Sequence, residues 1–128
     1  MGLCNLYRGL AQLAGQTPED VTAADVTARA EAGADPLCSK AVAMFCAMLG
    51  TVAGNLALTL GAFGGIYIGG GIVPRLGEGF DRSAFRERFE AKGRFRDYLA
   101  GIPTTVITHP LPAFLGLKAV LEKPLETR

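Results

Sequence analysis

Residues 41–74, AVAMFCAMLGTVAGNLALTLGAFGGIYIGGGIVP, form a long stretch without a charged side chain, and they include three consecutive glycines, Gly69, Gly70 and Gly71. Two kinds of structure are this apolar. One is a membrane-spanning helix followed by a re-entrant segment, since a spanning helix needs about 20 mostly apolar residues. The other is a buried helix that leads into a buried strand, with glycines where a ligand or another backbone comes close. The choice between them decides the fold class.

The membrane alternative has some support. Residues 41–60 are long enough to span a bilayer, and Gly50 with Gly54 forms a small-xxx-small pair of the kind that brings membrane helices together. However, no Trp/Tyr belt marks its ends, and the basic residues Lys40 and Arg75 flank both ends instead of marking one side. The sequence therefore favours a buried helix, and we expect no membrane insertion.

Composition narrows the function classes. The chain has 128 residues, which is the size of one domain, and a formal net charge of +1, so no global field attracts nucleic acid or an anionic surface. Its three cysteines, Cys4, Cys38 and Cys46, contain no C-x-x-C pair and predict reduced thiols in a cytosolic protein. The single His109 cannot build a metal site alone, and we expect none.

Local signals predict helices in the first sixty residues. Leucines at helical spacing predict a helix over residues 5–14, and the capping box Thr22–Asp25 opens a short helix to about Ala32. The pair Asp35–Pro36, an N-cap followed by proline, begins a helix that runs to about Leu60. This helix is apolar nearly all round, so we expect it to be buried on several sides.

Gly50 and Gly54 lie inside the long predicted helix, where glycine lowers helix propensity. Their missing side chains therefore indicate a close approach of another backbone. Cys38 and Cys46 lie about two turns apart on one face of the same helix, where packing is their expected role.

Two short strands follow. Residues 64–69 predict a doubly buried strand, because the apolar residues do not alternate with polar ones, and Thr104–Thr108 predict a second strand. We expect a helix to begin near Pro74, and a final helix over Ala113–Glu122. Strand, helix and strand in this order imply a right-handed parallel crossover, and hence an α/β fold.

An amphipathic helix is predicted between the strands. Asp81 or Ser83 would cap it, and Phe85 and Phe89 would face the core at i,i+4 spacing. Its charged residues would face water, and Gly93 would end it. These charged residues are Arg82, Arg86, Glu87 and Glu90.

Two parallel strands are too few for a stable sheet, because parallel sheets are normally covered on both faces and contain more strands. We therefore expect residues 1–128 to be an incomplete domain that lacks strands on its N-terminal side.

The sequence resembles a known enzyme family. Residues 50–76 look like the C-terminal part of bacterial ATP-dependent glucokinase, and FEAKGRFRDY at 89–98 is similar to the segment that follows the nucleotide site in that family. The match continues at Ile102–Pro103, His109 and Leu115–Gly116. Residues 3–8, LCNLYR, resemble the helix after the Ser-Gly-Pro-Gly turn of the family. The resemblance covers nearly the whole chain, but only the last third or so of a glucokinase.

The resemblance implies a fold and a ligand. Glucokinases belong to the hexokinase and actin-like ATPase superfamily, so residues 1–128 would be part of a ribonuclease-H-like large lobe. From the residues alone, Gly69, Gly70 and Gly71 indicate either a tight turn or a ligand contact. The resemblance favours a contact with the adenosine of ATP, and it places Gly2 near the adenine as well.

The resemblance also implies that residues 1–128 lack the catalytic and sugar-binding groups of a glucokinase. A glucokinase uses MgATP and glucose, but its phosphate loops, its Asn-Asp pair with the catalytic base and its Glu/His sugar ligands would lie upstream of Met1. The carboxylates Asp81, Glu87 and Glu90 belong to helices that we expect to be solvated, and His109 is expected to be structural. We therefore assign no catalytic residue, and we expect the chain alone to be inactive on glucose.

Two other classes of function compete with a kinase for this sequence. A non-catalytic interaction or oligomerisation module would use the apolar surface that missing strands leave bare, and we expect a homo-oligomer for that reason. Nucleic-acid binding would use the basic residues of segment 82–96 with three interleaved phenylalanines. Acidic residues interspersed among these basic residues weaken the positive electrostatic potential of the segment, so we expect no nucleic-acid partner.

Overall fold

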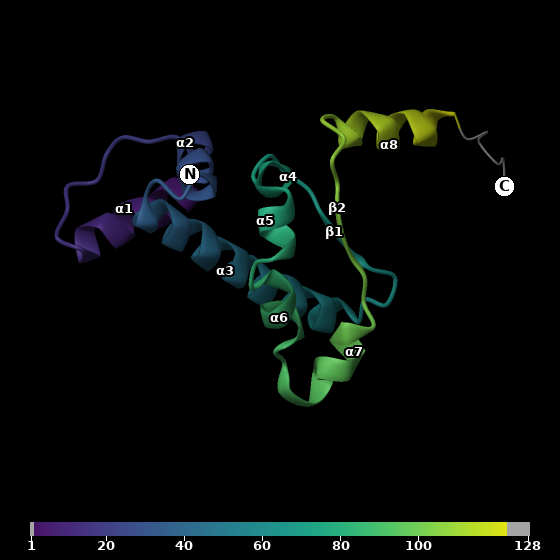
Figure 1. The fold of residues 1–128 in the computed structure, drawn as a ribbon. Coiled ribbons are helices and arrows are strands. Elements are labelled where there is room, and N and C mark those ends of the chain that lie inside the picture. The colour runs from purple at the N-terminus through teal and green to yellow at the C-terminus, as the bar shows by residue number, and fades with distance from the viewer. Residues whose placement is uncertain (1, 123–128) are drawn as a thin grey trace, which may run out of the picture.

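The structure is a computed structural model that describes residues 2–122. A long central helix, α3 (Pro36–Leu60), joins two parts of the molecule (Figure 1). Helices α1 (Gly2–Leu13) and α2 (Ala23–Glu31) pack against its N-terminal half, and the strands and short helices lie around its C-terminal half. These later elements are β1 (Ile66–Ile68), α4 (Val73–Leu76), α5 (Glu78–Asp81), α6 (Phe85–Glu90), η1 (Gly93–Phe95), α7 (Arg96–Ala100), β2 (Thr104–Val106) and α8 (Pro112–Leu121).

Two of the predicted helix starts are confirmed by their capping contacts. The Thr22 backbone N–H donates to the Asp25 carboxylate at 2.8 Å, and the Asp25 N–H donates to the Thr22 hydroxyl at 3.2 Å, which completes the capping box of α2. At the start of α3, the Asp35 carboxylate accepts from the N–H of Leu37 at 2.8 Å. Gly61 ends α3 in the left-handed conformation, at φ 58°.

The cysteines are free thiols, and two of them are packed into the core as predicted. Cys38 and Cys46 are fully buried, whereas Cys4 is partly exposed. Burial and the neighbouring Asp35 carboxylate raise the pKa of the Cys38 thiol to about 11, so this thiol stays protonated at neutral pH.

The contact between α3 and α6 explains the glycines inside α3. A Cβ atom on Gly50 would overlap the carbonyl oxygen of Phe85, and one on Gly54 would overlap that of Phe89. The two helices therefore touch backbone to backbone, as the sequence predicts. The aromatic rings of Phe85 and Phe89 lie in the same core cluster as Cys46, and Phe89 is fully buried.

The prediction that α3 is buried on several sides is wrong for the described structure. Its core-facing residues, such as Ala41 and Ala57, are fully buried, but an apolar ridge with i,i+4 spacing stays exposed. The ridge consists of Met44, Met48, Val52, Leu56 and Leu60, which are 38–69% exposed. No described element covers this side of the helix.

Strands β1 and β2 form a two-stranded parallel sheet, with Ile66 opposite Thr104 and Ile68 opposite Val106. The parallel pairing is confirmed. The predicted double burial of the first strand is wrong, because Ile68 is buried while Tyr67 is 71% exposed. Successive side chains of a strand point to opposite faces, and within residues 2–122 only one face of this sheet is covered.

Between the strands, the helix cap and the orientation of one arginine differ from the prediction. Asp81 lies in α5 and does not cap α6, whereas the Ser83 hydroxyl accepts from the Phe85 N–H at 3.3 Å. Arg86 turns inward instead of facing water. It donates to the carbonyls of Leu99, Ala100 and Ile102 at 3.3, 2.8 and 2.8 Å, and it pairs with Glu90. Arg86 therefore fixes the end of α7 and the turn that leads into β2.

Helix α8 extends away from the rest of the molecule (Figure 1). None of its residues is buried, although five of its ten residues are large and apolar: Phe114, Leu115, Leu117, Val120 and Leu121. The charged C-terminal stretch of the sequence, Glu122 to Arg128, lies mostly outside the described residues.

The helix contact predicts a position-specific effect of alanine. Gly50→Ala should lower the free energy of unfolding by about 2 kcal/mol, because its methyl group collides with backbone that cannot rotate away. Gly9→Ala, in open space on α1, should raise it by roughly 0.5–1 kcal/mol. Urea unfolding followed by circular dichroism measures both. Equal stability of the two variants would contradict the backbone contact.

The Arg86 contacts predict a contrast between two arginines. Arg86→Met should cost about 2 kcal/mol, because three carbonyls lose a charged donor. Arg82→Met should change stability by no more than about 0.5 kcal/mol, since its ion pair with Glu78 is exposed at both ends. The same unfolding experiment measures both variants. A cost for Arg86→Met as small as that for Arg82→Met would refute the anchoring role.

Candidate functional site

The glycine turn lies at the carboxyl ends of the parallel strands. Gly69, Gly70 and Gly71 directly follow β1, and Ile107, whose N–H donates to the Ile68 carbonyl at 2.9 Å, directly follows β2. In open α/β sheets, ligands bind in the crevice outside the carboxyl ends of the strands. The glycine turn therefore lies at the end of the sheet where open α/β folds bind ligands, and its contact with a ligand stays a prediction.

The three glycines differ in what their backbone requires. Gly70 has φ 117°, a conformation that other residues rarely adopt, while no positive φ is found at Gly69 or Gly71. A Cβ atom on Gly70 or Gly71 would meet no atom within 4 Å. The turn is thus open on its outer side, and a side chain there would enter the space that a ligand would use.

A hollow of about 450 Å³ opens beside this turn. Gly70, Gly71, Pro74 and Arg75 form one wall of it, and residues 107–110 with Pro112 form the other. The structure therefore brings together two segments that lie more than thirty positions apart in the sequence.

His109 lines the same hollow. Its Nδ1 accepts a hydrogen bond of 3.1 Å from the Leu111 N–H, so the ring is held by the chain that leads into α8. This contact agrees with the structural role expected for His109.

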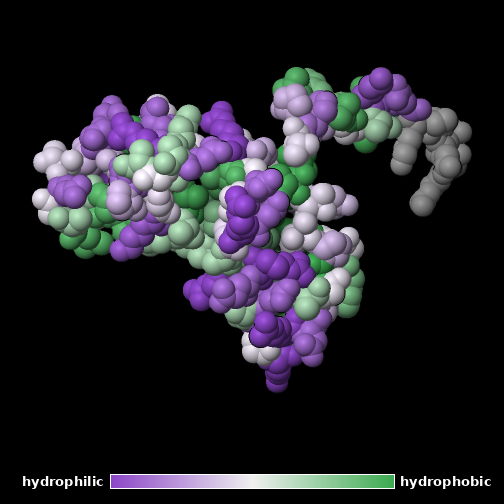
Figure 2. Space-filling model, in the orientation of Figure 1, coloured by the Kyte–Doolittle hydropathy of each residue, from purple (hydrophilic) through white to green (hydrophobic). Residues whose placement is uncertain are grey.

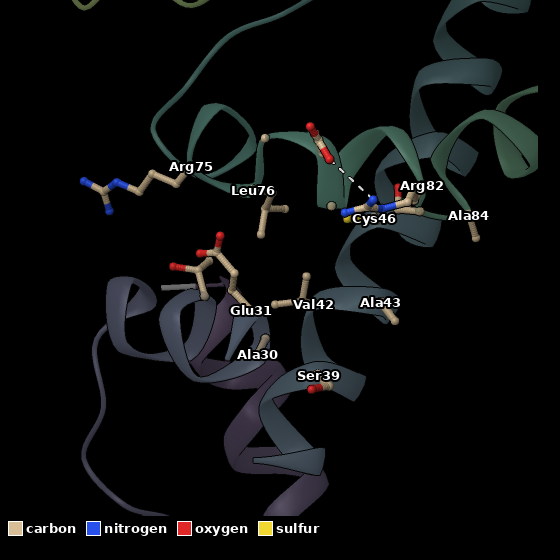
Figure 3. Close-up of a pocket in the computed structure, with 15 residues that line it drawn as sticks. Ala30, Glu31, Ser39, Val42, Ala43, Cys46, Arg75, Leu76, Arg82 and Ala84 are labelled. Carbon is tan, nitrogen blue, oxygen red and sulfur yellow. Dashed lines mark ion pairs between the residues drawn. The ribbon is translucent and has the colours of Figure 1, made fainter. Parts of the chain in front are cut away.

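A larger hollow, of about 610 Å³, separates α2 and α3 from the segment α4–α5 (Figure 3). Glu31, Val42 and Leu76 point into this space, whereas the Arg75 side chain extends away from it (Figure 3). Arg82 lies at its far end in an ion pair with Glu78, at 3.4 Å. Arg75 is the residue that lines both this hollow and the one beside the glycines.

Gly2 lies in a different place from the glycine turn. It begins α1 and lines an apolar hollow of about 430 Å³ between α1 and α3, together with Asn5 and Leu6. The described structure does not bring Gly2 into either hollow beside Arg75, and its part in nucleotide binding stays a prediction.

No cluster of three metal-ligating side chains occurs within residues 2–122. Of the carboxylates considered from the sequence, Asp81 and Glu87 are exposed, and Glu90 is largely buried in its pair with Arg86. These groups do not converge on either hollow, so the described residues offer no carboxylate set for a divalent cation.

Sequence reasoning missed Arg75 and Glu31 as residues of a hollow. In the sequence Arg75 is a basic flank of the apolar stretch, and Glu31 falls within the short helix that is predicted to run to about Ala32. Only the tertiary packing of α2 against α4 brings them to the same space. The spacing of these residues in the sequence gives no signal for that contact.

The basic segment 82–96 does not form a uniform positive face. Hydrophilic residues gather around α6 and α7 in the lower part of the view (Figure 2), but acids are interspersed there. Arg86 is used internally, and Lys92 donates to the Thr51 carbonyl at 3.0 Å. Phe85 and Phe89 are buried core residues and are not available to stack on bases.

Helix α3 is long and apolar enough to cross a membrane by length and composition alone. A third of its most apolar 18-residue window is buried inside the structure, where it packs against α1, α2 and α6. Such packing on several helices is also the behaviour of a core helix.

These features define a helix-rich α/β protein whose candidate ligand site lies at the ends of two parallel strands. The sequence matches the family Glucokinase over residues 1–124, and the chain belongs to this family.

Individual relatives agree. The chain is 56% identical to a glucokinase of Aromatoleum aromaticum over 97% of its length, and 58% identical to the "Bifunctional protein glk" of Burkholderia pseudomallei over 99%. The crystal structure of a glucokinase from an Antarctic psychrotroph matches 94% of the chain with a TM-score of 0.84 and 38% identity. The chain spans 38%, 20% and 37% of the length of these three proteins.

Proposed function

We propose that this chain is the C-terminal part of an ATP-dependent glucokinase. The whole protein would transfer the γ-phosphoryl group of ATP to the 6-hydroxyl of glucose, in the cytosol. Residues 1–128 would be part of a ribonuclease-H-like lobe of the actin-like ATPase type, and would form part of the adenosine side of the nucleotide cleft. The observation that carries this proposal is the open glycine turn at the carboxyl ends of β1 and β2 in a member of the glucokinase family.

The turn suits the flat face of a nucleoside. Gly70 and Gly71 leave room for a ring to approach the backbone, and the hollow beside them is lined on the other side by residues 107–110. Arg75 carries a fixed positive charge at the edge of this hollow, which suits a ligand that carries phosphates.

The described residues can bind and orient a nucleotide, but they offer no base for the sugar hydroxyl. Phosphoryl transfer needs positioned phosphates, a divalent cation and a carboxylate that accepts the hydroxyl proton. No cluster of three metal-ligating side chains occurs within residues 2–122, so these residues would not hold Mg²⁺ by themselves. In the proposed enzyme, the phosphates and groups outside this chain would hold the cation, and glucose would bind outside this chain as well.

A second candidate is a non-catalytic interaction module. The exposed ridge of α3 and the unburied helix α8 favour it, because both leave apolar side chains in water. Association of two copies would cover such surfaces, and a homo-oligomer is part of the proposal.

The proposed nucleotide contact predicts an unequal effect on the two substrates. The test protein is a chimera in which the part of the Aromatoleum aromaticum glucokinase that this chain does not match precedes the chain. In it, Gly70→Val should raise the KM for ATP about tenfold, since the side chain enters the nucleotide space, and should leave the KM for glucose within about twofold. A coupled glucose 6-phosphate assay measures both constants.

Two matched variants separate contact from strain. Gly33→Val places the same side chain in open space at φ 63°, far along the chain, and should leave both constants unchanged. Gly71→Val has no positive φ to strain the fold and should reproduce the effect on ATP. An equal rise of both KM values in folded Gly70→Val and Gly71→Val would refute the assignment of this turn to adenosine.

A further inference from the structure

His109 is held in place by its own chain. Pro110 follows it, and a residue before proline is confined mostly to extended backbone, while the proline ring fixes the next φ angle. The imidazole Nδ1 accepts a hydrogen bond of 3.1 Å from the Leu111 N–H, which fixes the ring as well. The side chain is therefore oriented before a ligand arrives, although it lies at the surface.

The same contact decides which nitrogen of His109 carries the proton. A neutral imidazole has one N–H group and one acceptor nitrogen, so a ring that accepts at Nδ1 carries its proton on Nε2. Within residues 2–122 no acceptor pairs with this Nε2–H group. His109 therefore brings an oriented and unused donor to the hollow beside the glycine turn, which it lines.

The other side chains of this hollow have matching chemistry. Arg75 supplies charged donors, and its side chain extends away from the larger hollow between α2 and α4–α5 (Figure 3). Thr108 supplies a hydroxyl, and no carboxylate of the described residues lines the space. These groups suit a ligand that brings hydrogen-bond acceptors and negative charge. The remaining wall includes prolines, which have no N–H group: Pro74, Pro110 and Pro112.

A phosphate oxygen fits this hollow better than a ribose hydroxyl does. In dinucleotide-binding folds a carboxylate accepts from the ribose hydroxyl, and the described residues that line this hollow include none. Arg75 and His109 belong to opposite walls, so a phosphate between them would accept from both. Gly70 and Gly71 leave the adjoining backbone open to the nucleoside.

We infer that His109 binds a phosphate oxygen of the nucleotide through its Nε2–H group, opposite Arg75. The inference rests on the proposed function, because it takes the nucleotide from the same reaction. It gives His109 two roles: Nδ1 holds the turn that leads into α8, and Nε2 binds the ligand. The glycine turn then leaves room for the nucleoside, whereas His109 and Arg75 select a ligand that carries phosphate.

Two substitutions separate the roles of the two nitrogens. In His109→Asn the side-chain oxygen can take the place of Nδ1 and accept from the Leu111 N–H, but no donor reaches the place of Nε2. In His109→Gln the longer side chain can bring an amide N–H to the place of Nε2, while the acceptor for Leu111 is lost. Circular dichroism checks that both variants of the chimera defined above are folded.

The kinetics of the chimera should follow the Nε2 donor. His109→Asn should raise the KM for ATP about tenfold, and His109→Gln should stay within about threefold of the parent. The KM for glucose and kcat should stay within about twofold in both variants. A purely structural role predicts the reverse order, with His109→Gln the more damaging. That order, an unchanged KM for ATP in His109→Asn, or a His109→Asn variant that does not fold would each overturn the inference.

Inhibitors distinguish a contact with phosphate from one with the nucleoside. ADP and adenosine are both tested in competition with ATP. His109→Asn should raise the inhibition constant of ADP about tenfold and change that of adenosine by no more than about twofold, because adenosine carries no phosphate. An equal rise for both compounds would place His109 against the nucleoside and refute the phosphate contact.

The imidazole can also be observed directly. His109 is the single histidine of the chain, so its ¹⁵N resonances need no assignment against other rings. In mildly alkaline buffer, the chain alone should show a protonated Nε2 and an unprotonated Nδ1. The opposite tautomer would overturn the inference.

The same spectra separate this inference from the proposed function. An active chimera whose KM for ATP is unaffected by His109→Asn would refute the role of His109 alone. A chimera that does not phosphorylate glucose would refute the proposed function, and titration of the chain with ADP then decides about His109. A shift of the Nε2 resonance that adenosine does not cause would support the phosphate contact, and an unchanged resonance would refute it.

Discussion

The backbone contact of α3 with α6 is the constraint on which the rest of the structure depends. Gly50 and Gly54 let the two helices meet at the carbonyls of Phe85 and Phe89, and the rings of those phenylalanines enter the core cluster. Arg86, on the same helix α6, then holds the end of α7 and the entry to β2. Residues 107–110, directly after β2, form the wall of the hollow that faces the glycine turn. The position of the candidate site therefore depends on the close contact that Gly50 and Gly54 allow between α3 and α6.

The elements that the sequence predicts well are those with local signals. The capping box at Thr22, the Asp35–Pro36 start and the end at Gly61 depend on neighbouring residues alone, and each lies where it was expected. The two strands and their parallel pairing also follow from hydrophobic pattern and order. Gly50 and Gly54 indicated a close contact, although nothing local names the helix that makes it.

Tertiary context decides the rest. Arg86 and Glu87 are adjacent in an amphipathic pattern, yet Arg86 turns inward because three carbonyls at the end of α7 need donors. The apolar pattern of α3 and β1 predicts burial on all sides, but the described residues cover only one side of each. An apolar pattern indicates that a surface packs against something, but it does not identify the element that it packs against. The hollow lined by Arg75 and Glu31 likewise arises only from packing.

The most direct measurement is a coupled assay of glucose phosphorylation by the purified chain with MgATP, with the oligomeric state followed by light scattering. We expect a folded protein without turnover, because the described residues hold a candidate nucleotide contact but no set of groups for a divalent cation or a base for the sugar hydroxyl. Turnover that persists through purification and is lost on mutation of a residue of this chain would contradict that view. It would mean that these 128 residues contain a complete active site.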